Sequence, residues 1–243
     1  NIDVTAVDIF KIPKMPDHAE AYATPCGIDE HYIVIPTKES DSFLSYDLLI
    51  HELGHTVEYT QRRKKLDPAY IFGHPLLSET IAHYYQMIYM LKHSTREERL
   101  SMLCSITESY VFNRFIQIMQ DIEPQNPKFD FSKITRHKDF NELAFAYQST
   151  PVLENLINKY DEKEFAQIFY DHHAKRSGVF LALNFIKYKF DIKELFDIKL
   201  PKETIDLSKL IAQTNLKPKK LFDFSKIDET LNSFINGTLS NNC

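Results

Sequence analysis

The chain of 243 residues has no tryptophan and only 5 glycines. Scarce glycine argues against a β-sandwich, whose many tight turns use that residue, and favours a helix-rich protein. The sequence contains no run of about 18 or more apolar residues, so we expect no membrane-spanning helix. Its 29 basic and 34 acidic residues are interspersed, and a net charge of -5 argues against a broad nucleic-acid-binding surface.

Cysteine is also sparse, with Cys26, Cys104 and Cys243 widely spaced and no CxxC pair. An odd, scattered set is not typical of a disulfide framework, so we expect the cytoplasm or another reducing compartment. Residue 1 is Asn, which leaves open a removed targeting segment. Secretion into a host cell is the alternative localisation.

The most informative stretch is His51-Glu52-Leu53-Gly54-His55, an HExxH motif inside a run from residue 40 to 65 with helical spacing of its apolar positions. Residues four apart lie on the same face of a helix, so His51 and His55 can both direct an imidazole nitrogen at one zinc ion. Glu52 is rotated away from that pair and is placed to act on a metal-bound water. Gly54 is expected to leave room beside the metal.

A third metal ligand is available 24 residues after His55, at Glu79. It lies in a segment that predicts a second helix, with Pro75 near its first turn. Three protein ligands and one water make a catalytic zinc site, whereas four protein ligands close a structural one. His74, in the preceding loop, is the nearest competitor to Glu79 as a ligand.

These features resemble the gluzincin metallopeptidases, and most nearly the oligoendopeptidase F and thimet oligopeptidase family. The resemblance extends upstream through Tyr22–Gly27 and His31–Pro36, and it covers about Glu20 to Gln86. It implies one zinc ion per chain, a peptidase activity and a zincin-like fold.

By the same resemblance, His51, His55 and Glu79 would bind zinc and Glu52 would be the general base. Two departures stand out. Those oligopeptidases are much longer, with a helical lid over a deep channel. Many gluzincins also carry an Asp four residues after the glutamate ligand to orient the first histidine, and this chain has His83 there.

The fold expected is α+β and predominantly helical, with a small N-terminal sheet beside the HExxH helix. Strand-like segments occur within residues 1–37, at 2–7, 9–12 and 32–35. The last of these is either an internal strand or an edge that holds an extended substrate. We expect one compact domain over 1–243, with the sheet and metal helices in 1–93 and a helical subdomain in 94–243 that closes the cleft.

A capping box at Ser94–Glu97 predicts the start of a helix that runs to about Asp121, and further helices follow to the C-terminus. Peptide hydrolysis also needs a donor for the oxyanion besides the metal. Tyr147 is the first choice, because residues 145–160 resemble the late helix pair that carries such a tyrosine in several gluzincins. His172 and His173 are the alternatives, and only one of two adjacent helical residues can face a cleft.

The sequence therefore predicts a zinc-dependent endopeptidase in which Glu52 takes a proton from a zinc-activated water and delivers it to the leaving amine. Its partners would be peptide or protein substrates, and its oligomeric state is left open. A bacterial effector that cuts a host protein is one setting for so compact a protease, although no motif supports it. The alternative function is a non-catalytic or regulatory binding module on a peptidase scaffold.

Overall fold

A computed structural model of the chain describes residues 6–13, 21–36, 44–66, 74–102, 118, 121–122, 133, 136–140, 177–199 and 207–239. The chain forms two compact units. One comprises Asn1–Ser101 with Gly178–Cys243, and the other comprises Met102–Ser177. The architecture is α+β and mostly helical, as expected from the sequence, and the first unit contains a three-stranded sheet and the HExxH helix.

The sheet has the strand order β1-β3-β2, built from β1 (Val7–Ile12), β2 (Tyr22–Pro25) and β3 (His31–Pro36). β3 pairs in parallel with β1 and antiparallel with β2. It is the central strand, so the internal-strand interpretation of residues 32–35 is correct and edge pairing of a substrate on this strand is excluded. β2 was not expected as a strand; it is short and ends at Pro25, a residue that sheets tolerate at their edges.

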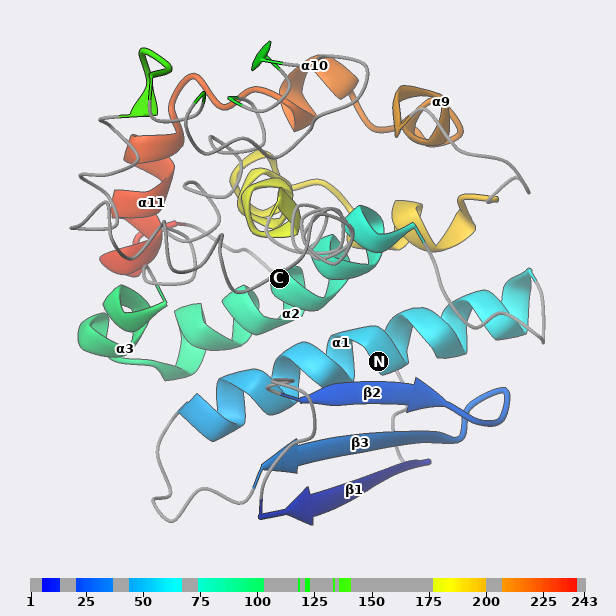
Figure 1. Ribbon diagram of the computed structural model, residues 1–243. Coiled ribbons are helices and arrows are strands. Elements are labelled where there is room, and N and C mark those ends of the chain that lie inside the picture. The colour runs from blue at the N-terminus through cyan, green and yellow to red at the C-terminus, as the bar shows by residue number, and fades with distance from the viewer. Residues whose placement is uncertain are drawn as a thin grey trace. The chain divides into compact units, whose positions relative to one another are not determined.

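The alternation of buried and more exposed side chains along β3 shows which face of the sheet packs against the helices. His31, Ile33 and Ile35 are buried, whereas the intervening residues are more exposed. Successive side chains of a strand point to opposite faces, so these three lie on one face. α1 (Leu44–Lys65) covers the sheet, and α2 (Pro75–His93) packs along the other side of α1 (Figure 1).

Because α1 lies between the sheet and α2, residues 54–60 are buried all round the helix. Its polar side chains there need partners. Arg62, fully buried, donates to the Glu58 carboxylate at 2.9 Å and to the backbone carbonyls of Leu195 and Ile198 at 2.9 and 2.7 Å. A buried ion pair with its other donors satisfied is the arrangement in which the cost of desolvating both charges is best offset.

The same contacts tie the C-terminal part of the chain to the N-terminal part. The Arg62 bonds reach η1, a 3-10 helix at Ile192–Asp197, and Arg99 donates to the carbonyl of Ile235 at the end of α11 (Ile227–Ile235). Residues 178–243 consequently form one compact unit with the sheet, α1 and α2. This division differs from the expected one at residue 93, and closure of a cleft by residues 94–243 stays a prediction.

Helix starts follow their expected signals with one shift. α2 begins at Pro75, with His74 at the N-cap position. The capping box belongs to Thr95 and Glu98, one residue later than expected: Thr95 Oγ1 accepts from the Glu98 N–H at 3.2 Å, and Glu98 accepts from the Thr95 N–H at 2.6 Å. The helix that it opens, α3, spans only Arg96–Ser101 and does not continue to Asp121.

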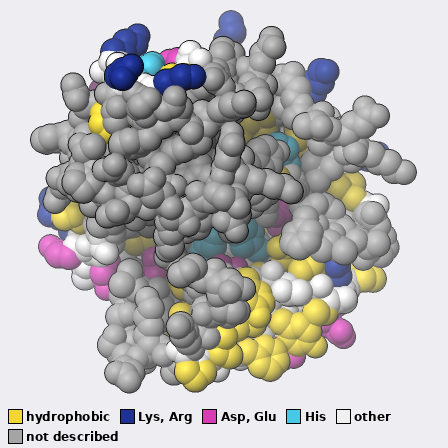
Figure 2. All heavy atoms as spheres, in the orientation of Figure 1, with side chains coloured by type: hydrophobic (Ala, Val, Ile, Leu, Met, Phe, Trp, Pro, Cys, Tyr) yellow, Lys and Arg dark blue, Asp and Glu magenta, His cyan; other side chains and the backbone are white. Residues whose placement is uncertain are grey.

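The remaining described elements are helical. They are the helix at residues 177–188, α9 (Leu207–Ile211) and α10 (Pro218–Leu221). Apolar side chains of the sheet also reach the surface, where Ile9, Phe10, Tyr22 and Tyr32 are exposed, and Figure 2 shows apolar groups gathered over the lower part of that view. Across the ranges that the structure describes, no helix has the length and apolar character needed to cross a bilayer.

Candidate metal centre

The site is built where α1 and α2 cross, and the closest approach is at Gly54. A Cβ on this residue would lie 2.6 Å from the Cα of Ala82, too close for any side chain. Glycine is therefore required for the two helices to meet at this distance. The expectation that Gly54 leaves room for the metal is corrected to this extent: the space that it vacates is filled by the backbone of α2.

The crossing brings together the histidines of α1 and the glutamate of α2. His51 Nε2 lies 3.4 Å from Glu79 Oε2, and His55 Nε2 lies 3.7 Å from Glu79 Oε1. Donor atoms bound at about 2.1 Å to a tetrahedral zinc ion stand roughly 3.4 Å apart. Each histidine nitrogen thus lies at about that distance from one oxygen of Glu79, and all three side chains are largely buried.

Hydrogen bonds at the other ring nitrogens orient both imidazoles. His51 Nδ1 is 3.3 Å from Gln86 Oε1, and His55 Nδ1 is 3.1 Å from Ser78 Oγ. Histidines that bind metals characteristically donate their second N–H in this way, which fixes the tautomer and leaves the Nε2 lone pair for the ion. Gln86 and Ser78 had no role in the sequence prediction, and only the packing of α2 against α1 brings them to the histidines.

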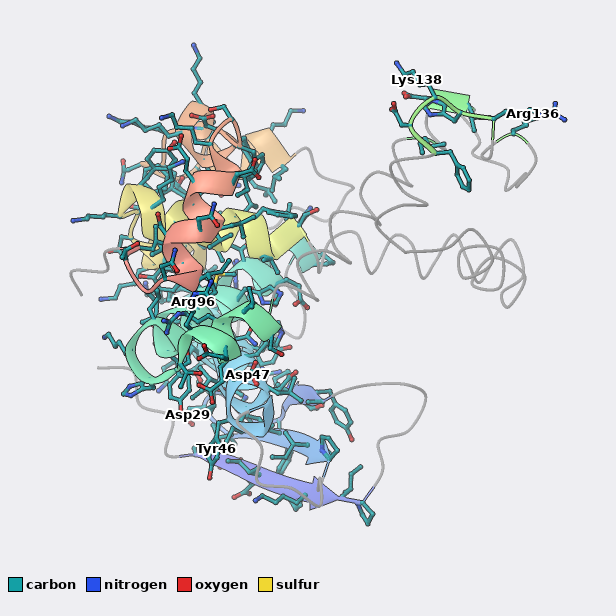
Figure 3. All side chains as sticks on the ribbon, turned by 90° about the vertical axis from the view of Figure 1, so that its left-hand side faces the viewer. Asp29, Tyr46, Asp47, Arg96, Arg136 and Lys138 are labelled. Atoms are coloured by element: carbon teal, nitrogen blue, oxygen red, sulfur yellow. The ribbon has the colours of Figure 1, made fainter. Side chains whose placement is uncertain are left out.

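Gln86 is itself anchored by Asp47, in the first turn of α1, labelled in Figure 3. Gln86 Nε2 donates to Asp47 Oδ2 at 3.3 Å, and the Leu48 N–H donates to Asp47 Oδ1 at 2.8 Å. An ionised carboxylate only accepts hydrogen bonds, so the amide nitrogen of Gln86 faces Asp47 and its oxygen faces the histidine. Burial raises the pKa of Asp47, against the bonds from Leu48 and Gln86, which lower it.

The histidines and Glu79 each stabilise the charged form of the other. Burial alone would lower the pKa of His51, but its hydrogen bond with Glu79 and the charges of Glu79 and Glu52 raise it overall. Burial alone would raise the pKa of Glu79, but His51, His55 and His83 hold it well below its usual range. Glu79 is therefore an anionic donor at neutral pH, and its charge would meet that of a divalent cation.

His83 joins the cluster, although the sequence marked it only as a departure from the gluzincin pattern. Its ring lies edge-on to His51 with 4.5 Å between ring centroids, and its Nε2 is 3.9 Å from Glu79 Oε2. Within the described residues, the set whose donor atoms all lie within 4.8 Å of one another is His51, Glu79 and His83. His55 lies outside that tightest set even though it contacts the opposite oxygen of Glu79. Burial, then the charge of His51, lowers the pKa of His83 to about 3.

Behind Glu79, a second glycine permits close packing. A Cβ on Gly178 would lie 2.7 Å from the Cβ of Glu79 and 2.9 Å from the backbone nitrogen of Thr80. The backbone of the helix at residues 177–188 thus packs closely against the turn of α2 that carries Glu79. Nothing in the local pattern around residue 178 indicates this contact, because it joins segments about a hundred residues apart in the chain.

The general-base candidate, Glu52, is buried on α1 immediately after His51 and is only 6% exposed. Its charge contributes to raising the pKa of His51 and that of Tyr59, whose own burial has the larger effect. The role of Glu52 as a general base stays a prediction from its place in the HExxH motif.

Of the other residues singled out from the sequence, Tyr147, His172 and His173 lie outside the described residues. His74 is described, at the N-cap position of α2, where its carbonyl accepts from the Leu77 and Ser78 N–H groups. Its imidazole is not part of the set of converging donor atoms.

Two imidazoles with anchored Nδ1 atoms and one carboxylate are donors that zinc favours, so the residues present fit such an ion.

Comparison of the chain with protein-family models, with curated proteins and with solved structures finds no match.

Proposed function

We propose that the protein is a zinc-dependent peptidase with its active centre at the crossing of α1 and α2. The observation that carries the proposal is the convergence of His51 Nε2 and His55 Nε2 on the two oxygens of Glu79, at 3.4 and 3.7 Å. Together with the HExxH spacing and the resemblance to oligoendopeptidase F and thimet oligopeptidase, this arrangement supports one metal ion held by these three residues.

Zinc, when bound, supplies a Lewis acid that polarises a carbonyl and makes water more acidic. The chain supplies the rest of the chemistry. The Glu52 carboxylate accepts a proton from the attacking water and returns it to the amine of the departing product. Gln86 and Ser78 hold the histidine rings, and the burial of the cluster strengthens its electrostatic interactions. Peptides or proteins are the proposed substrates.

The decisive experiment compares the wild-type protein with Glu52→Gln. Both are loaded with zinc, their metal content is measured, and a proteome-derived peptide library is digested to map cleavage products. We expect equal zinc content and loss of nearly all cleavage in Glu52→Gln, because an amide cannot accept the proton. Glu97→Gln, an exposed change on α3, is the matched control and should cleave like the wild type. Zinc-dependent cleavage that survives Glu52→Gln would refute the general-base role.

A second function has one observation in its favour. His83 adds a further nitrogen donor to the cluster, and four protein ligands are typical of structural zinc sites, which lack an open position for catalysis. The non-catalytic binding module predicted as the alternative would bind zinc with full occupancy and show no zinc-dependent cleavage of any library peptide. The experiment above therefore separates the two functions.

A further inference from the structure

His83 occupies a place in the cluster that neither the HExxH spacing nor the resemblance assigns. It follows Glu79 by one helical turn on α2, and its imidazole is mostly buried at 15% side-chain exposure. Its Nε2 faces Glu79 Oε2, the same oxygen that faces His51 Nε2. We propose that His83 is a fourth donor of the metal centre, an inference that rests on the metal site proposed above.

The tautomer of His83 is the first argument. Its Nδ1 lies 2.9 Å from Gln86 Oε1, the atom that also faces His51 Nδ1. The bond from Gln86 Nε2 to Asp47 points the amide nitrogen away, so the group facing both rings is an acceptor. Both histidines must therefore carry a proton on Nδ1, and Nε2 is the ring atom that each has left to bind a metal ion.

Distance is the second argument. The 3.9 Å between His83 Nε2 and Glu79 Oε2 exceeds the roughly 3.4 Å separation of two donors on a tetrahedral zinc ion by only half an ångström. The donor atoms of His51, Glu79 and His83 lie within 4.8 Å of one another. His83 Nε2 therefore lies close to the separation from Glu79 that two donors of one zinc ion would have.

Two other roles for His83 fit the geometry less well. A hydrogen-bond donor to a developing oxyanion would need its N–H at Nε2, the opposite tautomer from the one that Gln86 sets. A purely structural role would need only the ring contact of His83 with His51. It would not require His83 Nε2 to face the Glu79 carboxylate, which His51 and His55 also face. Metal binding uses both the tautomer and the direction of the ring.

The donor set then comprises three imidazoles and one carboxylate. Four protein donors fill a tetrahedral set, so hydrolysis requires either a fifth position or release of His83. The resting centre would thus differ from a site with two histidines, one glutamate and an open position.

Proton NMR of the cobalt(II)-loaded protein tests the inference directly. Each coordinated imidazole with a proton on Nδ1 gives one strongly shifted, exchangeable resonance. We expect three such resonances in the wild type, two in His83→Ala and three in His93→Ala, an exposed change on the same helix. Zinc affinity, measured by competition with a chromophoric chelator, should fall at least about tenfold in His83→Ala and stay unchanged in His93→Ala.

The wild-type spectrum is decisive even if His83→Ala does not fold. Three resonances in the wild type support the inference. Two resonances, with stoichiometric cobalt bound, overturn the role of His83 while the proposed metal centre stands. If the wild type binds neither cobalt nor zinc in stoichiometric amounts, the proposed function itself fails, and this inference fails with it.

Discussion

Replacing Asp47 by Asn tests whether charge, rather than shape, prepares the metal centre. Asp47 receives the Gln86 Nε2 hydrogen bond at 3.3 Å, and this bond directs the amide oxygen toward His51 and His83. An asparagine can donate as well as accept, so Gln86 can turn over and present its nitrogen to the rings. The rings would then carry their protons on Nε2, the atom that has to bind the metal ion.

Loss of such outer hydrogen bonds typically weakens metal binding about 10- to 100-fold, or roughly 1.4–2.7 kcal/mol. We expect an effect of that size on the zinc dissociation constant of Asp47→Asn, measured by chelator competition. Gln86→Glu alone should also be harmful, because two carboxylates about 4 Å apart repel by about 4 kcal/mol at an effective dielectric constant of 20.

The double variant Asp47→Asn with Gln86→Glu reverses the polarity of the pair. The new carboxylate accepts from both rings, and the new amide donates to it, so zinc affinity should return to within about threefold of the wild type. Asp29→Asn is the control for a lost aspartate, since Asp29 lies in an exposed ion pair with Lys64. If the double variant binds zinc as weakly as the summed single changes imply, or if Asp47→Asn binds like the wild type, control of the tautomer is refuted.

Three further predictions concern packing, pH and the oxyanion. Gly54→Ala should lower the free energy of unfolding by about 1–3 kcal/mol and weaken zinc binding, because its Cβ would lie 2.6 Å from Ala82; denaturant titration and chelator competition measure the two effects. His31 is buried, and its pKa is lowered to about 4 by burial first and by the charge of Arg63 second. The imidazole is therefore protonated near pH 6.5 in the unfolded chain but only near pH 4 in the folded chain. Stability should therefore fall by on the order of 1–3 kcal/mol as the pH drops through that window, and His31→Gln, unfolded by denaturant at pH 7 and pH 5, should lack that part of the slope. Tyr147→Phe should lower turnover about a hundredfold at unchanged zinc content, and unchanged turnover in steady-state kinetics would exclude Tyr147 as the oxyanion donor.

The local sequence was enough to predict those features that depend on one element alone. Helical periodicity places His51 and His55 on one face of α1, because every fourth residue of a helix points the same way. Pro75 marks the start of α2, since its fixed backbone angle suits the first turn. The mostly helical α+β class follows from the same periodicity and from the composition.

What the tertiary structure decided is how the elements meet. Three contacts join residues from different segments of the chain. Gly54 packs against Ala82, Gln86 is hydrogen-bonded to both His51 and His83, and Gly178 packs against Glu79. A periodic pattern shows which way a side chain points along its own helix, but it does not show which residue of another helix lies opposite. That choice depends on the crossing of the helices, which the packing of the whole core sets.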